Sequence, residues 1–285
     1  MATSRSAVRI EPSGGGVGAF VDNIDLSRVR SGTVDKLRGA LGEYGVLFFR
    51  EQPLSPAQHI RVAEKFGDIN VNRFFQHVDG YPRIAEVRKE PGQSRNIGGA
   101  WHADHSYDLA PAMGSMLIAR ETPKGGGDTL FASTCRAFET LSDGLKETLL
   151  GLNAVHSSRH VFGAKAMVAR EEMKGRLGNA EAATQDAVHP VVIRHPISGR
   201  CSLYVNPGFT LRIDGWSDAE SRPFLDMLYQ HVTRPEHTYR FNWAPGSIAF
   251  WDNRASWHYA VNDYHGARRL MHRITLEGES LSAAA

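Results

Sequence analysis

The sequence has few cysteines, no long apolar run and little net charge, and each absence excludes a class of protein. Cys135 and Cys201 are the only two cysteines in 285 residues, so no disulfide framework is expected and a cytoplasmic location is predicted. No apolar run approaches the roughly 20 residues of a membrane span, and the N-terminal stretch MATSRSAVRI lacks the apolar core of a signal peptide. A formal net charge of +2 is too small to indicate a nucleic-acid or membrane partner.

Several catalytic motifs are also missing. The glycine-rich stretches SGGGVG (13–18) and GGGDTLF (125–131) lack the Gly-Lys-Ser/Thr of a phosphate-binding loop. Ser106 and Ser256 lack the Gly-x-Ser-x-Gly turn of a nucleophilic serine. His156 and His160 are four residues apart, but no Glu-x-x-His context supports a zinc site there. The glycine-rich stretches are therefore interpreted as turns.

What the chain contains is mostly short strand patterns, with helices between some of them. Strands are predicted at 46–50, 189–195, 202–206, 238–243, 247–253 and 269–278. Helices are predicted around 34–41, from Ser55, from Ser142 to about Leu152, and after the Ser217–Glu220 capping box, where Pro223 should kink the helix or delay its start. No repeat or linker divides residues 1–285, so we expect one domain, mainly β with peripheral helices.

Residues 163–187 differ from the rest of the chain. This segment is polar, rich in alanine and glycine, and poor in large apolar side chains. Long insertions of this kind often form active-site lids, or are disordered. We interpret the segment as a lid insertion between core strands.

Histidine is abundant, with 13 residues, and it is a common metal ligand. Two His-x-Asp triplets occur. His77 and Asp79 lie in HVDGYP, which is typical of a turn. His102 and Asp104 lie in WHADHSY, where an extended backbone would project both to one face, and a solvated polar turn is the alternative. His105 is an odd step from His102 and should face away, so it is not predicted to bind metal.

A mononuclear iron oxygenase needs two histidines and one carboxylate on one side of the metal. The C-terminal region offers His258, His265 and His272 for the third ligand, and His258 follows a predicted strand in a Trp-rich setting. Arg269 and Arg273 are an even number of residues apart, so on a strand they share a face. Arginine can hold a carboxylate through two hydrogen bonds. An edge strand with both arginines in water is the alternative.

The stretches WHAD, GGDTLF, WDNRASWH and RRLMHRITLEG follow one another along the chain. In this order they resemble the taurine dioxygenase/2,4-dichlorophenoxyacetate dioxygenase (TauD/TfdA) family, and the likeness spans nearly the whole chain. The resemblance implies a distorted double-stranded β-helix, or jelly roll, that uses Fe(II), 2-oxoglutarate and O2. It assigns His102, Asp104 and His258 to the metal, and Thr129 and Arg269 to the far carboxylate of 2-oxoglutarate.

The resemblance also implies a substrate site. Arg273 matches the position that holds the anionic group of the substrate, and Asn72, Phe75 and Phe162 fall in the stretches that would line the pocket. The charges of Fe(II), Asp104, 2-oxoglutarate and Arg269 cancel, which leaves Arg273 as the free cation. We therefore expect a small organic anion with an apolar body, such as an alkyl sulfate or an aryloxyalkanoate. Taurine and amino-acid derivatives are the alternatives within the family.

The implied reaction is hydroxylation of a substrate C–H group, with release of a leaving group if the oxidised carbon bears one, coupled to conversion of 2-oxoglutarate to succinate and CO2. Two other classes remain open. A zinc hydrolase could use the same three ligands without needing Thr129 and Arg269. A non-catalytic jelly-roll binding protein would not need a complete ligand set. Since family members are often dimers or tetramers, a homo-oligomer is expected.

Overall fold

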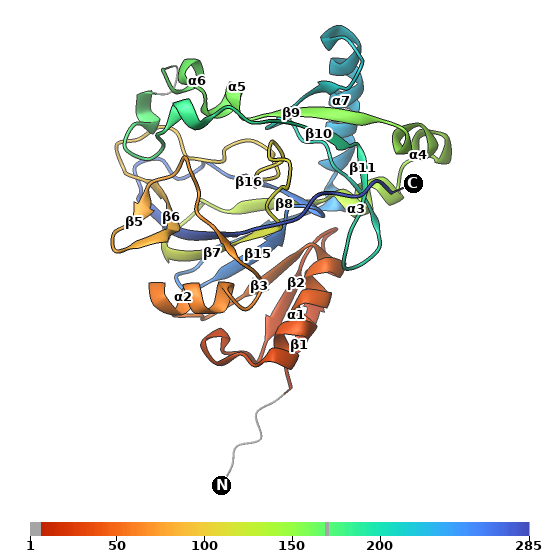
Figure 1. Cartoon of the computed structure of the whole chain (residues 1–285). Coiled ribbons are helices and arrows are strands. Elements are labelled where there is room, and N and C mark those ends of the chain that lie inside the picture. Colours follow the sequence, from red (N-terminus) through yellow and green to blue (C-terminus); the bar gives the residue numbers. More distant parts are fainter. Residues whose placement is uncertain (1–6, 169–170, 285) are drawn as a thin grey trace.

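The computed structural model describes residues 7–168 and 171–284 and is built around β-sheets (Figure 1). The largest sheet contains β1 (Arg9–Pro12), β2 (Ala19–Asp22), β3 (Val46–Phe49), β4 (Ile69–Asn70), β5 (His77–Val78), β6 (Tyr81–Lys89), β7 (Gly114–Glu121), β15 (Ile248–Asp252) and β17 (Arg269–Leu276). Its order is β1-β2-β3-β15-β7-β17-β6-β5, with β4 paired to β17.

Three smaller sheets complete the β structure. The first has the order β14 (Thr238–Phe241), β8 (Thr129–Ser133) and β16 (Ser256–Ala260). The second has β10 (Asp186–Pro190), β9 (Asn153–Ser157) and β13 (Thr210–Ile213), and the third pairs β11 (Val192–Arg194) with β12 (Cys201–Leu203). The single strand predicted at 189–195 is wrong. Pro190 has no N–H for a further ladder bond, and beyond it the chain leaves β9 to pair with β12.

Helices lie around the sheets. The α-helices are α1 (Ser31–Tyr44), α2 (Pro56–Ala63), α3 (Thr134–Glu139), α4 (Asp143–Leu150), α5 (Arg159–Phe162), α6 (Ala164–Val168) and α7 (Asp218–Val232). Short 3-10 turns are η1 (Leu26–Arg28), η2 (Glu171–Met173), η3 (Ala180–Ala182) and η4 (Pro235–His237). The predicted capping box at Ser217 is confirmed, and because α7 begins at Asp218 with Pro223 inside it, its start is not delayed. Within the described ranges, no helix combines the length and apolar character needed to cross a bilayer.

The central strands β3 and β15 of the main sheet are buried along their whole length, which explains their continuous apolar runs. Leu47 and Phe49 of β3 pack with α1 and α2 in one cluster. Val46 and Phe48 face the other way, toward the β14-β8-β16 sheet, where Phe48 stacks on Phe241 with ring centroids 4.4 Å apart. The mainly β architecture with peripheral helices is therefore confirmed, and the space between the two sheets holds the candidate site.

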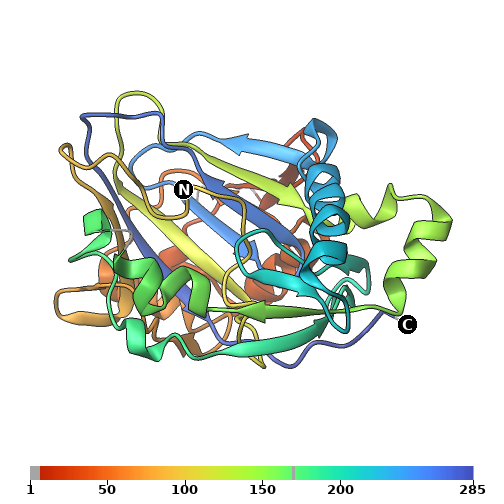
Figure 2. The same ribbon diagram turned by 90° about the horizontal axis from the view of Figure 1, so that it is seen from above.

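The segment 163–187 carries α6, η2, η3 and the first residues of β10. Figures 1 and 2 show α5 and α6 at the end of the molecule where β5 and β6 lie, far from α4 and α7. Leu177 forms an isolated bridge with Phe75, and the Gln76 N–H donates to the Arg176 carbonyl. Residues 169–170 of this segment lie outside the described residues. The interpretation as a lid remains a prediction.

Candidate metal centre and substrate pocket

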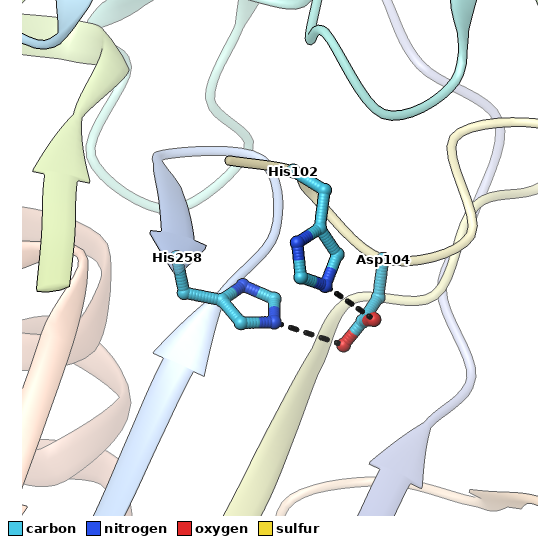
Figure 3. A group of neighbouring side chains, drawn as sticks. All are labelled: His102, Asp104 and His258. Atoms are coloured by element: carbon cyan, nitrogen blue, oxygen red, sulfur yellow. Dashed lines mark ion pairs between the residues drawn. The ribbon is translucent and has the colours of Figure 1, made fainter. Parts of the chain in front are cut away.

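Three side chains with metal-ligating atoms meet between the sheets (Figure 3). His102, Asp104 and His258 each offer one ligand atom, and these atoms lie within 4.8 Å of one another. The Nε2 atom of each histidine is 3.8 Å from an oxygen of Asp104. Two imidazoles and one carboxylate form the donor set of a mononuclear site with open positions for other ligands. The residues present therefore fit Fe(II).

Backbone pairing brings the two histidines together. His258 lies on β16, and the N–H groups of His102 and His258 each donate to the other residue's carbonyl, at 3.1 and 2.9 Å. The sequence predicted an extended backbone from His102 through Asp104, but the extended pairing ends at this bridge. Asp104 opens a turn in which His105 has a left-handed φ of 60°. Its carboxylate reaches the histidines from the turn and not from a shared strand face.

Both imidazoles can act as ligands, and a hydrogen bond fixes the ring of His102. The Nδ1–H of His102 donates to the Ala100 carbonyl at 2.8 Å, which leaves the lone pair on Nε2 toward Asp104. Burial lowers the pKa of His102, and burial together with nearby His102 lowers the pKa of His258 well below its ordinary value. Neutral imidazole is the form that binds a metal ion.

Asp104 is held as a carboxylate. Burial alone would raise its pKa, but the charge of Arg273 and the neighbouring imidazoles outweigh burial and hold the pKa below its ordinary range. Arg273 Nη1 donates to the two carboxylate oxygens at 3.1 and 3.3 Å, and Ser115 donates to one of them at 3.3 Å. Arg273 therefore has a protein partner in the structure, because two buried opposite charges this close form an ion pair.

All the residues that the sequence assigned to the site line one cavity of about 650 Å³. They are His102, Asp104, His258, Thr129, Arg269, Arg273, Asn72, Phe75 and Phe162. Sequence reasoning missed much of the apolar wall, namely Ile97, Tyr107, Met173, Leu177 and Phe209. These side chains come from separate segments, and no local pattern marks them.

Arg269 and Thr129 offer hydrogen-bond donors at one side of the cavity. Arg269 is 4% exposed. Its Nε donates to the Gly127 carbonyl at 3.0 Å, whereas its Nη2 has no partner among the described residues. Burial lowers the pKa of Arg269. A buried guanidinium with an unused N–H group fits an anionic ligand such as a carboxylate.

The GGGDTLF stretch has a structural role in this arrangement. Gly126 and Gly127 adopt left-handed φ values of 75° and 72°, which glycine tolerates. The Gly127 N–H donates to Asp263 at 2.7 Å, while its carbonyl accepts from Arg269. Thr129 then begins β8. The turn therefore places Thr129 and the acceptor for Arg269 next to each other.

The predicted substrate-binding residues are linked by contacts. The Arg273 guanidinium lies 4.3 Å from the centroid of the Phe75 ring. Asn72 Oδ1 accepts from the Phe75 N–H at 3.1 Å, and Asn72 Nδ2 donates to His105 Nε2 at 3.2 Å. His105 Nδ1 donates to Asp108 at 2.9 Å. Asn72 thus stabilises the loop that carries Phe75, and both nitrogens of His105 are used outside the metal cluster.

The remaining histidine candidates lie outside the metal-ligand cluster, although His160 lines the same cavity. His77 lies on β5, and Asp79 lies in the hairpin turn between β5 and β6. His272 accepts from Arg120 at 3.1 Å. His156 contacts Ser106, and the His160 ring donates to the Gly208 carbonyl. Within the part of the chain that the structure describes, the single cluster of three or more metal-ligating side chains is His102, Asp104 and His258.

Comparisons with known proteins agree with this geometry. A profile of the "Taurine catabolism dioxygenase TauD, TfdA family" matches residues 9–275. An alkylsulfatase from Acinetobacter baylyi is 37% identical, over 95% of this chain and 85% of the relative. An alpha-ketoglutarate-dependent sulfate ester dioxygenase from Pseudomonas putida is 34% identical, over 98% of this chain and 93% of the relative. The solved structure of a taurine dioxygenase from Burkholderia xenovorans superposes with a TM-score of 0.81 at 32% identity, covering 97% of this chain and 91% of that one. The predicted jelly-roll fold is confirmed.

Proposed function

The chain belongs to the taurine catabolism dioxygenase TauD, TfdA family, and from this premise we propose that it oxidises a small organic anion with an apolar body, an alkyl sulfate ester first. Like its relatives, the protein is an Fe(II)- and 2-oxoglutarate-dependent dioxygenase. One observation carries the substrate proposal. Arg273 is a buried cation that contacts Asp104 on one side and the Phe75 ring on the other.

In the proposed enzyme, His102 and His258 hold Fe(II) through Nε2 and Asp104 holds it through carboxylate oxygen. When bound, Fe(II) and 2-oxoglutarate together supply the oxidising chemistry and consume O2, with succinate and CO2 as by-products. The hydrogen bond from His102 to Ala100 fixes the ring that faces the metal. Arg269 and Thr129 hold the far carboxylate of 2-oxoglutarate through Nη2 and the hydroxyl.

The formal charges of the complex favour a monoanionic substrate. With neutral histidines, Asp104 contributes −1 and the two arginines, Arg269 and Arg273, contribute +2. Fe(II) and the 2-oxoglutarate dianion cancel each other, so the loaded site keeps one positive charge. A substrate with one negative charge neutralises it, and burial strengthens that attraction.

The apolar wall selects the body of the substrate. Phe75, Phe162, Leu177 and Phe209 line the cavity and can pack against an alkyl chain. Hydroxylation of the carbon that bears the sulfate oxygen gives an unstable intermediate. Its C–O bond breaks to release an aldehyde and hydrogen sulfate. Two relatives named for alkyl sulfate or sulfate ester chemistry support this outcome.

A substrate panel tests the proposal. The purified protein is incubated in air with Fe(II), 2-oxoglutarate and hexyl sulfate, hexanesulfonate, taurine, 2,4-dichlorophenoxyacetate or an N-acetyl amino acid. Succinate and inorganic sulfate are measured. Hexyl sulfate should give equal amounts of both, well above the substrate-free rate. Faster succinate formation with taurine would contradict the substrate proposal, and sulfate without succinate would indicate a hydrolase.

Four further features belong to the same proposal. The enzyme is cytoplasmic, forms a dimer or tetramer, and acts without a nucleic-acid or membrane partner. The described residues of the segment 163–187 cover the cavity as a lid. Met173 and Leu177 from this segment line the cavity, and Glu172 accepts hydrogen bonds from Ser94 and from the Arg95 N–H, which supports the lid.

A further inference from the structure

Trp243 contacts Thr129 and Arg269, which line the cavity, but is not itself a lining residue. It follows β14 and is 6% exposed. Its Nε1–H donates to Thr129 Oγ1 at 3.0 Å. Its ring centroid lies 5.8 Å from the Arg269 guanidinium carbon. One indole therefore touches two side chains that come from different sheets.

The hydrogen bond to Thr129 restricts the threonine hydroxyl. An indole N–H can only donate, so the hydroxyl oxygen must accept in this bond. Thr129 still has its own hydrogen, and the structure gives the hydroxyl no second protein partner within the described ranges. The hydroxyl hydrogen is thus available to a ligand in the cavity.

The indole face similarly restricts Arg269. A guanidinium within about 6 Å of an indole centroid is attracted to the ring. Together with the Gly127 carbonyl, which accepts from Nε at 3.0 Å, the ring fixes the plane of the guanidinium. The buried Nη2 remains without a protein partner among the described residues. Both unused donors can then meet one carboxylate.

We infer that Trp243 is a positioning residue for the far carboxylate of 2-oxoglutarate, acting through Thr129 and Arg269. The inference rests on the proposed function. Without the indole N–H, the Thr129 hydroxyl can rotate and donate elsewhere, so the far carboxylate loses an oriented donor. Chelation of the metal by the keto acid end does not involve Trp243 and should not change.

The test uses Trp243→Phe, which keeps an aromatic ring beside Arg269 and removes the N–H. Calorimetry on the full-length, Fe(II)-loaded protein without oxygen gives Kd for 2-oxoglutarate and for 2-oxopentanoate, which has the same chain length but no far carboxylate. Kd for 2-oxoglutarate should rise about fivefold, the value of one ordinary hydrogen bond. Kd for 2-oxopentanoate should stay unchanged. Trp216→Phe, which alters a tryptophan outside the cavity lining, is the matched control and should change neither.

A double-mutant cycle checks the route through Thr129. In a Thr129→Val background, Trp243→Phe should have no further effect on 2-oxoglutarate binding. An unchanged 2-oxoglutarate Kd in Trp243→Phe, an equal loss for both keto acids, or a full additional loss in the Thr129→Val background would each overturn the inference. No sulfate ester is present in these titrations. If the wild-type protein bound no 2-oxoglutarate, that result would contradict the proposed function itself.

Discussion

Asp104 is the residue on which the charges of the site converge. It lies near both imidazoles, accepts from Arg273 and Ser115, and its own N–H donates to Asn253. Burial opposes its ionised form, and the charge of Arg273 contributes most among the groups that favour that form. A single carboxylate therefore links the proposed metal site to the proposed substrate site.

Replacing Asp104 by alanine should abolish metal binding and succinate formation, because the remaining two imidazoles lack the charged ligand. Binding of Mn(II) or Fe(II) by calorimetry, together with a succinate assay, measures both effects. Asp79→Ala is the matched control, since Asp79 belongs to the other His-x-Asp triplet but lies in a hairpin turn. Full succinate formation in Asp104→Ala would remove this residue from the site.

Replacing Arg273 by leucine should raise KM for hexyl sulfate by about tenfold to a hundredfold, the usual value of a charge-assisted hydrogen bond. The Kd of 2-oxoglutarate should change much less. Arg95→Leu removes an exposed cation at the same cavity and serves as the control. Equal effects of the two substitutions on KM would mean that only the general charge of the cavity matters.

At the scale of elements, Asn253 joins the end of β15 to the loop between Asp104 and β7. Its Oδ1 accepts from the Asp104 N–H at 3.3 Å and from Trp251 Nε1 at 3.0 Å, and its Nδ2 donates to the Ala112 carbonyl at 3.2 Å. One amide thus holds both ends of the loop that presents the carboxylate. The WDNR motif, which contains the last two residues of β15, therefore has a structural explanation beyond the strand itself.

Asn253→Ala should weaken Mn(II) binding about tenfold, as loss of a residue that orients a ligand commonly does. The measurement is a calorimetric titration of the full chain, accompanied by a thermal unfolding curve. Asn70→Ala removes an amide that bonds to Glu277 away from the cavity and should leave metal affinity unchanged. Unaltered metal affinity in Asn253→Ala would show that the turn holds Asp104 unaided.

The elements differ in how far the sequence predicts them. β3 and β15 are short apolar runs and α7 has a capping box, so local patterns locate them well. The turn at Asp104 depends on the left-handed backbone of His105, which no periodicity marks. The bridge between His102 and His258 joins distant segments, and only the family resemblance indicated it. The cavity wall and the pairing of Arg273 with Asp104 required the assembled fold for the same reason.

At the scale of the whole molecule, the main sheet separates two apolar clusters. One buried imidazole lies where its protonated form is unfavourable. His59 on α2 is fully buried, and neither ring nitrogen has a partner among the described residues. Burial, with Arg120 and His272 nearby, lowers the pKa of His59 to about 3. In the unfolded chain His59 has its ordinary pKa of 6.5. Near pH 5 its imidazole therefore binds a proton in the unfolded chain but not in the folded chain.

The free energy of unfolding should therefore fall as the pH drops below 6.5, because the unfolded state binds more protons. Between pH 7 and pH 5, His59 alone should account for about 2 kcal/mol of this loss. Urea denaturation of wild type and His59→Leu at both pH values measures it, with the exposed His265→Gln as control. An equal pH dependence in wild type and His59→Leu would contradict the prediction.

The most direct test of the proposed dioxygenase site is the fate of oxygen. The enzyme, Fe(II), 2-oxoglutarate and hexyl sulfate are incubated under ¹⁸O2, and the succinate and the C6 product are analysed by mass spectrometry. The expected result is succinate carrying one ¹⁸O atom, formed together with hexanal and sulfate, and absent in Asp104→Ala. Unlabelled hexanol and sulfate without succinate would contradict the account and indicate hydrolysis at the same three ligands.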